Sequence, residues 1–134
     1  MSDSDIITPK EARRLWVAAL RSSKYSQTKH VLHDDLGFCC LGVACEVFNE
    51  LRPGVLDITK APKSEDPSGL VHYDGYADTL PQEVMSFFSL ASDNGSYKDD
   101  EGVGGSLAED NDNGLTFSQI ADIIESEPEG LVTR

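Results

Sequence analysis

The residue types best suited to chemistry in this chain are three cysteines that stand within seven residues of one another. Cys39 falls near the start of a helix predicted over residues 36–51, where free backbone N–H groups and the helix dipole favour a thiolate. His72 lies in a predicted strand over residues 70–73, and Asp74 follows it. A thiolate with a histidine base and a carboxylate is a nucleophilic arrangement. The sequence therefore leaves open a papain-like thiol hydrolase that uses Cys39, His72 and Asp74.

A packing role explains the same cysteines without any reaction. Cys40 lies on the apolar face of the predicted helix, and free cysteine is among the most buried residue types. Asp34 and Asp35, just upstream, oppose formation of a thiolate. An odd number of cysteines in one short segment also does not resemble a disulfide framework, so we expect reduced thiols. We therefore take packing as the main interpretation and predict no catalytic residue.

Metal binding is not predicted, although two segments resemble parts of metal sites. Cys40 and Cys45 would lie roughly 140° apart around a helix of 3.6 residues per turn, a poor arrangement for one zinc ion. Residues 109–114 are similar to the start of an EF-hand loop and precede a helix. The twelfth loop position, which requires a bidentate glutamate, would be Ile120. We read residues 109–114 as a polar turn and expect no metal and no cofactor.

The charge of the chain is strongly negative and unevenly distributed. The formal net charge is −13 at pH 7, with +3 in residues 1–33, −7 in residues 34–90 and −9 in residues 91–134. A negative field of this kind repels the phosphates of nucleic acid. Residues 114–121 resemble the first helix of a helix-turn-helix unit, but the residues after Pro128 are too few for a recognition helix. We therefore expect no nucleic-acid ligand, and an acidic DNA mimic stays open as a second alternative.

Four helices are predicted. Thr8-Pro9-Lys10-Glu11 begins the first with a capping box and a proline in the first turn, and this helix runs to about Ser22. The second covers residues 36–51, where Gly42 suggests that another backbone packs close to it. The third begins near Leu80-Pro81 and ends at residues 93–95. The last begins at the capping box Thr116-Phe117-Ser118-Gln119 and ends at Glu127-Pro128. The apolar positions assigned to the four helices are Ala12, Leu15, Trp16, Ala19, Leu20, Leu36, Cys40, Val43, Ala44, Val47, Phe48, Leu51, Leu80, Val84, Phe87, Phe88, Phe117, Ile120, Ala121 and Ile124.

The remaining residues predict a few short strands and loops. Residues 30–33, 55–58 and 70–73 are candidate strands, and residues 91–114 read as an acidic loop rich in Gly, Asp and Asn, with one helical turn at residues 106–108. Residues 1–7 are expected to be flexible. The chain is therefore predicted to be an α+β, helix-rich single domain over residues 1–134. Its polar start and the lack of a long apolar run predict neither a signal peptide nor a membrane span, so we expect a cytoplasmic protein.

Three segments together resemble a group of small uncharacterised proteins found mostly in bacteriophage and prophage genomes. The first is Leu15-Trp16-Val17-Ala18-Ala19-Leu20-Arg21-Ser22-Ser23-Lys24-Tyr25-Ser26-Gln27. The second is Phe38-Cys39-Cys40-Leu41-Gly42-Val43-Ala44-Cys45, and the third is Asn111-Asp112-Asn113-Gly114-Leu115-Thr116-Phe117-Ser118-Gln119-Ile120-Ala121. The likeness covers most of the chain in outline, although Ser23 stands where the group usually has glycine. It implies a viral accessory protein acting in the cytoplasm of a bacterial host, and it carries over no functional residues.

The leading functional hypothesis is a non-enzymatic accessory module that binds a host protein or a small molecule. We expect its binding site where the start of the second helix meets the turn at residues 112–114, because polar turns beside helix termini are frequent ligand sites. The residues assigned to that site are Tyr25, Gln27, Cys39, Asp112 and Asn113. The oligomeric state is left open by the sequence.

Overall fold

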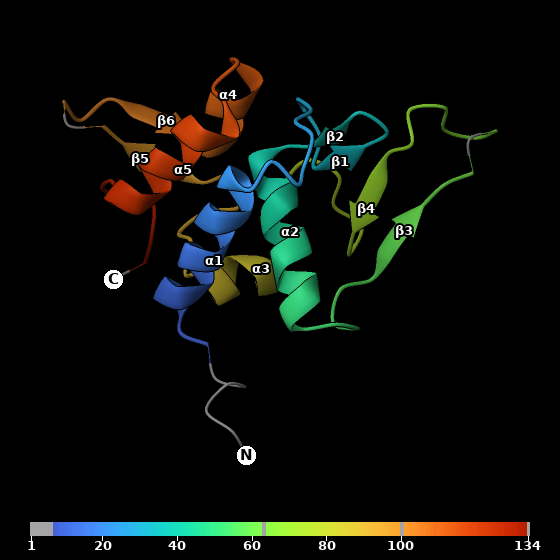
Figure 1. Ribbon diagram of the computed structural model, residues 1–134, viewed down its shortest axis with the longest axis horizontal. Helices are drawn as coiled ribbons and strands as arrows, with labels where there is room; N and C mark the ends of the chain where they lie inside the picture. Colours follow the sequence, from blue (N-terminus) through green and yellow to red (C-terminus); the bar gives the residue numbers. More distant parts are fainter. Residues whose placement is uncertain (1–6, 63, 100, 134) are drawn as a thin grey trace.

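Helices form the centre of the protein, and three small antiparallel sheets lie around them (Figure 1). The computed structural model describes residues 7–62, 64–99 and 101–133. Within these residues the helices are α1 (Pro9–Arg21), α2 (Cys40–Leu51), α3 (Gln82–Phe88), α4 (Leu107–Asp112) and α5 (Phe117–Ser126). The strands pair as β1 (His33–Asp34) with β2 (Gly37–Phe38), β3 (Ile58–Lys60) with β4 (Val71–Tyr73), and β5 (Ser96–Lys98) with β6 (Gly104–Ser106). The predicted α+β class is confirmed, with one helix more than the four predicted.

Helix α1 begins and ends as its sequence predicts. The Thr8 side chain accepts a hydrogen bond from the Glu11 N–H, and Pro9 occupies the first turn, where its missing N–H costs nothing. The buried face consists of Ala12, Trp16, Val17 and Leu20, and it packs against α5, α2 and α3. The assignment of Leu15 to this face is wrong, because the leucine is 41% exposed. Contact with α5 takes Val17 into the core and leaves Leu15 near the surface beside α2.

The second helix starts four residues later than predicted. The Asp34 carboxylate accepts hydrogen bonds from the N–H groups of Leu36 and Gly37, which is the local turn chemistry that competes with a helix. These bonds close the β1–β2 hairpin, and Leu36 at its tip is 76% exposed. The prediction that Leu36 belongs to an apolar helix face is therefore wrong. Cys39 takes the N-cap position of α2.

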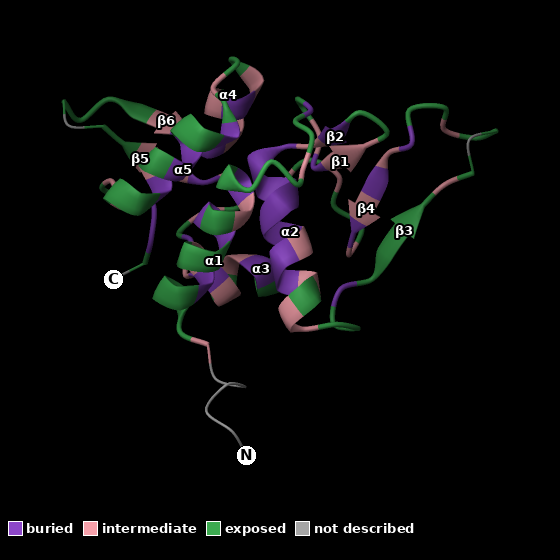
Figure 2. Cartoon of the chain, viewed as in Figure 1, coloured by how far each residue is buried: buried purple, intermediate pink, exposed green. Residues whose placement is uncertain are grey.

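Helix α2 is buried on nearly all sides over its first half. Residues 40–45 are all buried, and Figure 2 shows this helix as the most continuously buried element. The single apolar face predicted for it thus understates its burial, as expected for a helix at the centre of a fold. A Cβ atom built on Gly42 would lie 1.8 Å from the backbone oxygen of Leu32. The close backbone approach predicted for Gly42 is confirmed. It allows the backbone of Leu32, just before β1, to pack directly against α2.

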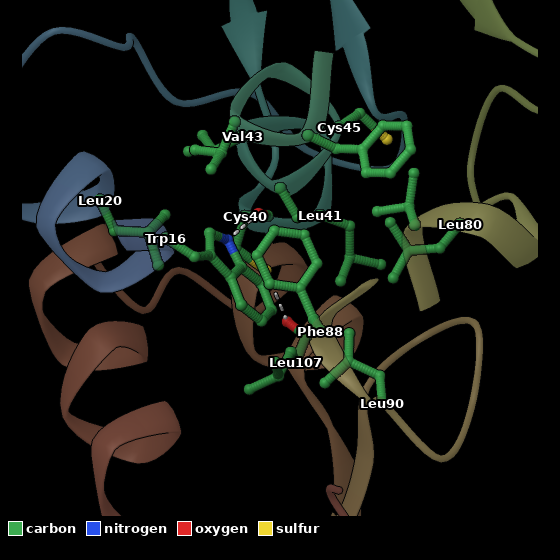
Figure 3. Packing of buried hydrophobic residues seen from close by; sticks show 14 of the residues in the cluster. Trp16, Leu20, Cys40, Leu41, Val43, Cys45, Leu80, Phe88, Leu90 and Leu107 are labelled. Carbon is green, nitrogen blue, oxygen red and sulfur yellow. Dashed lines mark hydrogen bonds between the residues drawn. The ribbon is translucent and has the colours of Figure 1, made fainter. Parts of the chain in front are cut away.

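The centre of the core is organised by Trp16. Its ring lies 5.2 Å from the Phe88 ring, measured between centroids, and its indole N–H donates to the Cys40 carbonyl at 2.9 Å. Figure 3 shows Trp16 reaching from α1 to the start of α2, with Leu107 of α4 close by. The tryptophan is fully buried, so a large apolar side chain and a satisfied polar atom together join three helices.

The segment between α2 and α3 forms a hairpin that extends away from the helices (Figure 1). The strand predicted over residues 70–73 is confirmed as β4, whereas the strand predicted over residues 55–58 begins only at Ile58. Residues of β3 are exposed, while Val71 and Tyr73 of β4 are buried. The hairpin therefore contacts the core through one strand only.

Residues 91–114 are more ordered than the predicted loop. They contain the β5–β6 hairpin and helix α4, so the helical turn expected at residues 106–108 extends to Asp112. The Ser106 side chain caps α4 by accepting from the Glu109 N–H. Because residues 109–112 are helical, they cannot form the start of an EF-hand loop.

The remaining helix ends follow local signals. Helix α5 has the predicted capping box between Thr116 and Gln119 and ends at Ser126, with Glu127 as its C-cap. Helix α3 ends at Phe88, earlier than predicted, because Ser89 adopts a left-handed conformation with φ of 54°. Ile7 packs against the core, and the flexibility expected for residues 1–7 stays a prediction. Residues 1–6 lie outside the described part of the chain.

Candidate functional site

The predicted junction between the start of α2 and the turn after α4 does form. Phe38 donates its N–H to the Ser26 carbonyl and accepts from the Thr28 N–H, each at 2.8 Å. This places residues 26–32 alongside the start of α2. Asp112, at the end of α4, accepts a 2.7 Å hydrogen bond from the His30 N–H. Three segments far apart in the sequence therefore meet where the sequence predicts.

Asn111 is the centre of this junction, and the sequence analysis missed its role. The side chain is fully buried. Its Nδ2 donates to the Thr28 carbonyl at 2.7 Å, and its Oδ1 accepts from Gln27 Nε2 at 2.9 Å and from the Cys40 N–H at 3.2 Å. The bond to Cys40 supplies an acceptor at the start of α2, where Cys39 provides no side-chain cap. Asn111 thus fastens α4 to both α2 and the 26–32 segment.

The residues predicted to bind a ligand are largely occupied by contacts within this junction. Gln27 also donates to the Leu115 carbonyl at 2.8 Å, so its amide nitrogen bridges two acceptors. Asp112 additionally lies 3.3 Å from His30 Nδ1. Asn113 is exposed and ends α4 as its C-cap. We interpret the junction as a structural clasp, since its polar groups satisfy one another.

Cys39 lies at the start of α2 as predicted, but its environment disfavours a thiolate. The residue is 6% exposed, and burial raises the pKa of the Cys39 thiol to about 11. The N–H groups of Gly42 and Leu41 lower this pKa, as expected at a helix N-terminus, but burial outweighs them, and Asp112 raises it further. Burial also raises the pKa values of Cys40 and Cys45. At neutral pH all three thiols are therefore protonated.

His72 and Asp74 do not join Cys39 in a catalytic arrangement. Because side chains alternate along a strand, His72 points to the face of β4 opposite to the buried Val71 and Tyr73. The Asp74 carboxylate accepts from the Asp57 N–H at 2.7 Å, which ties the residue after β4 to the residue before β3. Within residues 7–62, 64–99 and 101–133, no hydrogen bond or ion pair links these three candidates to one another. This geometry does not support the thiol hydrolase.

A polar chain that the sequence analysis did not identify runs from α2 to β1. Tyr73 is fully buried, and its hydroxyl donates to Glu46 Oε2 at 2.8 Å. His33 Nδ1 lies 3.2 Å from the same hydroxyl, and the His33 ring stacks on Phe38 with centroids 3.7 Å apart. Since the hydroxyl has one proton, Nδ1 of His33 must donate to it, which leaves Nε2 as an acceptor. No local motif signals this chain, because its members are paired only by the fold.

Burial sets the protonation states along this chain. Desolvation lowers the pKa of His33 despite the opposing influence of Glu46, and burial raises the pKa of Tyr73 beyond its usual range. The hydrogen bonds require a proton on the Tyr73 hydroxyl and on His33 Nδ1, and the lowered pKa of His33 favours the neutral ring. The arrangement resembles the orienting half of an acid–base site, but its residues line none of the three cavities between α1 and α5, between α1 and α2, and beside the β5–β6 hairpin.

An open groove of about 320 Å³ runs between α1 and α2, and Tyr25 is the one predicted site residue that lines it. Its walls are mainly apolar, formed by Leu15, Ala18, Ala19, Val47 and Leu51. At the Tyr25 end, Lys24 Nζ lies 3.1 Å from Glu50 Oε1 and 5.4 Å from the centroid of the Tyr25 ring. Tyr25 itself packs edge-on against Phe38. The groove is therefore apolar along its length and polar at one end.

Nowhere in the described residues do three or more His, Cys, Asp or Glu side chains gather as a metal would require. None of the helices in the same ranges is long and apolar enough to span a membrane.

Comparison with known proteins identifies the family of the chain. Residues 9–128 match the model of a domain of unknown function (DUF8296), so the chain belongs to this family. No curated protein and no solved structure matches the chain. The family match covers all five helices, the clasp and the α1–α2 groove, but it does not test the phage origin suggested by the sequence resemblance.

Proposed function

We propose that this protein is a non-enzymatic binding module that holds an apolar segment of a host protein in the α1–α2 groove. In keeping with the sequence resemblance, it would act as a phage accessory protein inside a bacterial cell. The observation that carries the proposal is the exposure of Leu15. This leucine belongs to the apolar pattern of α1, yet it is 41% exposed at the wall of an apolar groove. Burying the rest of its side chain would favour binding by about 1 kcal/mol.

The groove suits a protein segment better than a small molecule. It is an open trough between two helices, whereas small ligands are usually enclosed over most of their surface. Ala18 and Ala19 keep the α1 wall low, so that the side chains of an amphipathic segment can reach Val47 and Leu51. Tyr25 and the Lys24–Glu50 pair offer polar contacts at one end. Such an arrangement of an apolar centre and a polar edge is typical of protein interfaces.

Charge indicates the general nature of the partner. The net charge of −13 would accelerate association with a basic protein and repel acidic ones. Catalysis receives no comparable support, because the Cys39 thiol is buried with a raised pKa. The polar chain through Tyr73 also lies outside the α1–α2 groove. Binding through the groove is therefore the function that best fits the geometry.

Site-specific photo-crosslinking in living bacteria tests this proposal. A photoreactive phenylalanine analogue replaces Ala18 in the groove or, as a control, Leu36, which is 76% exposed on the β1–β2 turn. We expect a discrete adduct with a host protein from position 18 and no such adduct from position 36. Adding Leu15→Arg should remove the adduct, whereas adding Val55→Arg, at another exposed apolar residue, should not.

Three outcomes contradict the proposal. They are the absence of any adduct from position 18, the same adducts from positions 18 and 36, and an adduct that persists in the Leu15→Arg protein. An adduct made only of two copies of this chain would indicate self-association and would also count against a host partner. Each variant is first compared with the wild type by circular dichroism and urea unfolding, so that loss of the adduct is not confused with loss of the fold.

A further inference from the structure

A second groove, of about 420 Å³, lies on the opposite side of the domain from the β3–β4 hairpin. It is bordered by the β5–β6 hairpin, the start of α4 and the backbone of residues 129–130 (Figure 1). Its lining residues are Ser96, Tyr97, Lys98, Gly104, Gly105, Glu109, Glu129 and Gly130. None of them lines the α1–α2 groove, so the two surfaces can be tested independently.

Two successive glycines of β6 line this groove. A Cβ atom on Gly104 would meet nothing within 4 Å, and one on Gly105 would meet only the ring end of Tyr97, at 4.0 Å. Neither glycine has a positive φ, and any residue can adopt their backbone conformation. The backbone therefore does not require glycine here. Because side chains alternate along a strand, the two positions face opposite sides of β6, and a side chain at Gly105 is the one that would lie beside Tyr97 in the groove.

Carboxylates dominate the charge around this opening. Glu109 projects from the first turn of α4, and Glu129 lies across the groove with its side chain 78% exposed. The one cation in the lining is Lys98, whose Nζ is 3.9 Å from Glu129 Oε2. Asp110, next to the groove, accepts a hydrogen bond from the Tyr97 hydroxyl. This bond fixes the aromatic ring beside the glycines, and the site keeps a net negative charge.

We infer that this groove receives an arginine side chain from a basic segment of a protein partner. The inference deepens the proposed protein-binding function and rests on it for the nature of the partner, but it concerns a different surface. A guanidinium group forms planar hydrogen bonds with carboxylates and stacks on aromatic rings. Glu109, Glu129 and Tyr97 supply both kinds of group. A metal ion fits less well, because the described carboxylates do not gather in threes with other ligating side chains.

Titration of the ¹⁵N-labelled protein with N-acetyl-arginine amide tests the site directly by NMR. We expect saturable shifts of the Gly104 and Gly105 amide signals. The control probe is N-acetyl-citrulline amide, which has nearly the same shape but no charge, and it should leave these signals in place. N-acetyl-lysine amide, which is charged but cannot stack in the same way, should bind more weakly than the arginine probe.

Matched variants separate recognition at the groove from general attraction to an acidic protein. Glu109→Gln should weaken the arginine probe roughly five-fold, which corresponds to an exposed ion pair of about 1 kcal/mol. Glu101→Gln removes the same charge from an exposed residue outside the lining and should change the affinity less than two-fold, as expected when no direct contact is lost. Gly105→Val fills the groove without changing the charge, and it should abolish the shift of the remaining Gly104 signal.

The inference is overturned if the shifts do not saturate, if citrulline produces them equally, or if Glu109→Gln and Glu101→Gln behave alike. Preserved signals from α1 and α5 will establish that each variant is folded. If the Gly105→Val protein does not fold, the comparison of Glu109→Gln with Glu101→Gln still decides the test. Failure here would leave the photo-crosslinking result at Ala18 unaffected. Loss of the Ala18 adduct, in turn, would not alter the arginine titration.

Discussion

Replacement of Asn111 by aspartate should destabilise the protein strongly, and by an amount that depends on pH. The two side chains have the same shape, so Oδ1 can still accept from Gln27 and from the Cys40 N–H. The second oxygen of the aspartate, however, would replace the nitrogen that donates to the Thr28 carbonyl at 2.7 Å. Two acceptors would then face each other inside the clasp, one of them charged.

The size of the effect follows from the burial of the site. Loss of the hydrogen bond leaves the Thr28 carbonyl without its donor, which costs about 1–3 kcal/mol. An unpaired carboxylate at a fully buried position adds a further penalty, so we expect a total of about 3–5 kcal/mol at pH 7.5. A natural domain has only about 5–15 kcal/mol of stability. The variant should therefore be marginally folded at neutral pH.

Lowering the pH should restore part of this loss. Burial and the facing carbonyl would raise the pKa of the new carboxyl group in the folded state. The folded variant then binds more protons than the unfolded one between the unfolded pKa, near 4, and the raised folded pKa. Its stability relative to the wild type must therefore increase as the pH falls through this window, because the protonated acid can donate to Thr28.

Urea unfolding of wild type and variant at pH 7.5 and pH 5 measures this difference. The matched control is Asn113→Asp, the same change two residues away at an exposed position, which should cost no more than about 0.5 kcal/mol at either pH. A cost below about 1 kcal/mol for Asn111→Asp at pH 7.5, or a cost that does not shrink at pH 5, would refute the interpretation of Asn111 as the centre of the clasp.

Three further changes test other parts of the account. Gly42→Ala should lower the free energy of unfolding by about 3 kcal/mol or more in urea, because the new Cβ would lie 1.8 Å from the Leu32 oxygen; a change under about 1 kcal/mol would contradict this contact. Tyr73→Phe should cost about 1–2 kcal/mol by the same assay, since Glu46 loses its donor; an unchanged midpoint would mean that the polar chain adds nothing to stability. Because burial raises the pKa of Cys39 from 9.0 to about 11, the folded state holds this proton more tightly, and stability should fall between pH 9 and 11 by up to about 3 kcal/mol. Unfolding of Cys39→Ala over this range should show a smaller fall, and an identical fall would argue against the raised pKa.

Elements with local signals were predictable from the sequence, and those that depend on distant contacts were not. Thr8 and Thr116 mark the starts of α1 and α5 through caps that involve only neighbouring residues. The residues around β4 likewise predicted a strand at 70–73, where the structure has Val71–Tyr73. The early start predicted for α2 failed because the Asp34 side chain bonds to the Leu36 N–H and turns the chain. The spacing of apolar residues cannot show that this turn competes with the start of a helix.

The acidic segment at residues 91–114 illustrates a signal that was present but not used. Ser106 followed three residues later by Glu109 is a helix-start pattern, and it caps α4 in the structure. The β5–β6 hairpin has no comparable local sequence signal. Part of its pairing depends on a distant residue, since Lys98 of β5 also pairs with Glu129, which follows α5. The glycines Gly104 and Gly105 of this hairpin are as typical of a loop as of a strand.

Spatial proximity in the candidate site was predicted better than chemical role. The start of α2 was predicted to meet the turn at residues 112–114, and in the structure the Cys40 N–H bonds to Asn111, directly before that turn. Asn111 itself was not predicted, because a lone asparagine in a polar run carries no sign of burial. The exposure of Leu15 was likewise hidden, since the periodicity of α1 cannot tell which edge of its apolar face the neighbouring helices leave open.

The alkylation rate of Cys39 in the native protein tests the central claim, that this fold binds and does not react, most directly. Iodoacetamide is added at pH 7.5, and the modified thiol is followed by peptide mass spectrometry with and without urea. With the Cys39 side chain buried and its pKa near 11, we predict slow labelling that accelerates only as the protein unfolds. Rapid stoichiometric labelling of Cys39 in the folded protein would contradict the account and would return attention to a thiol-dependent reaction.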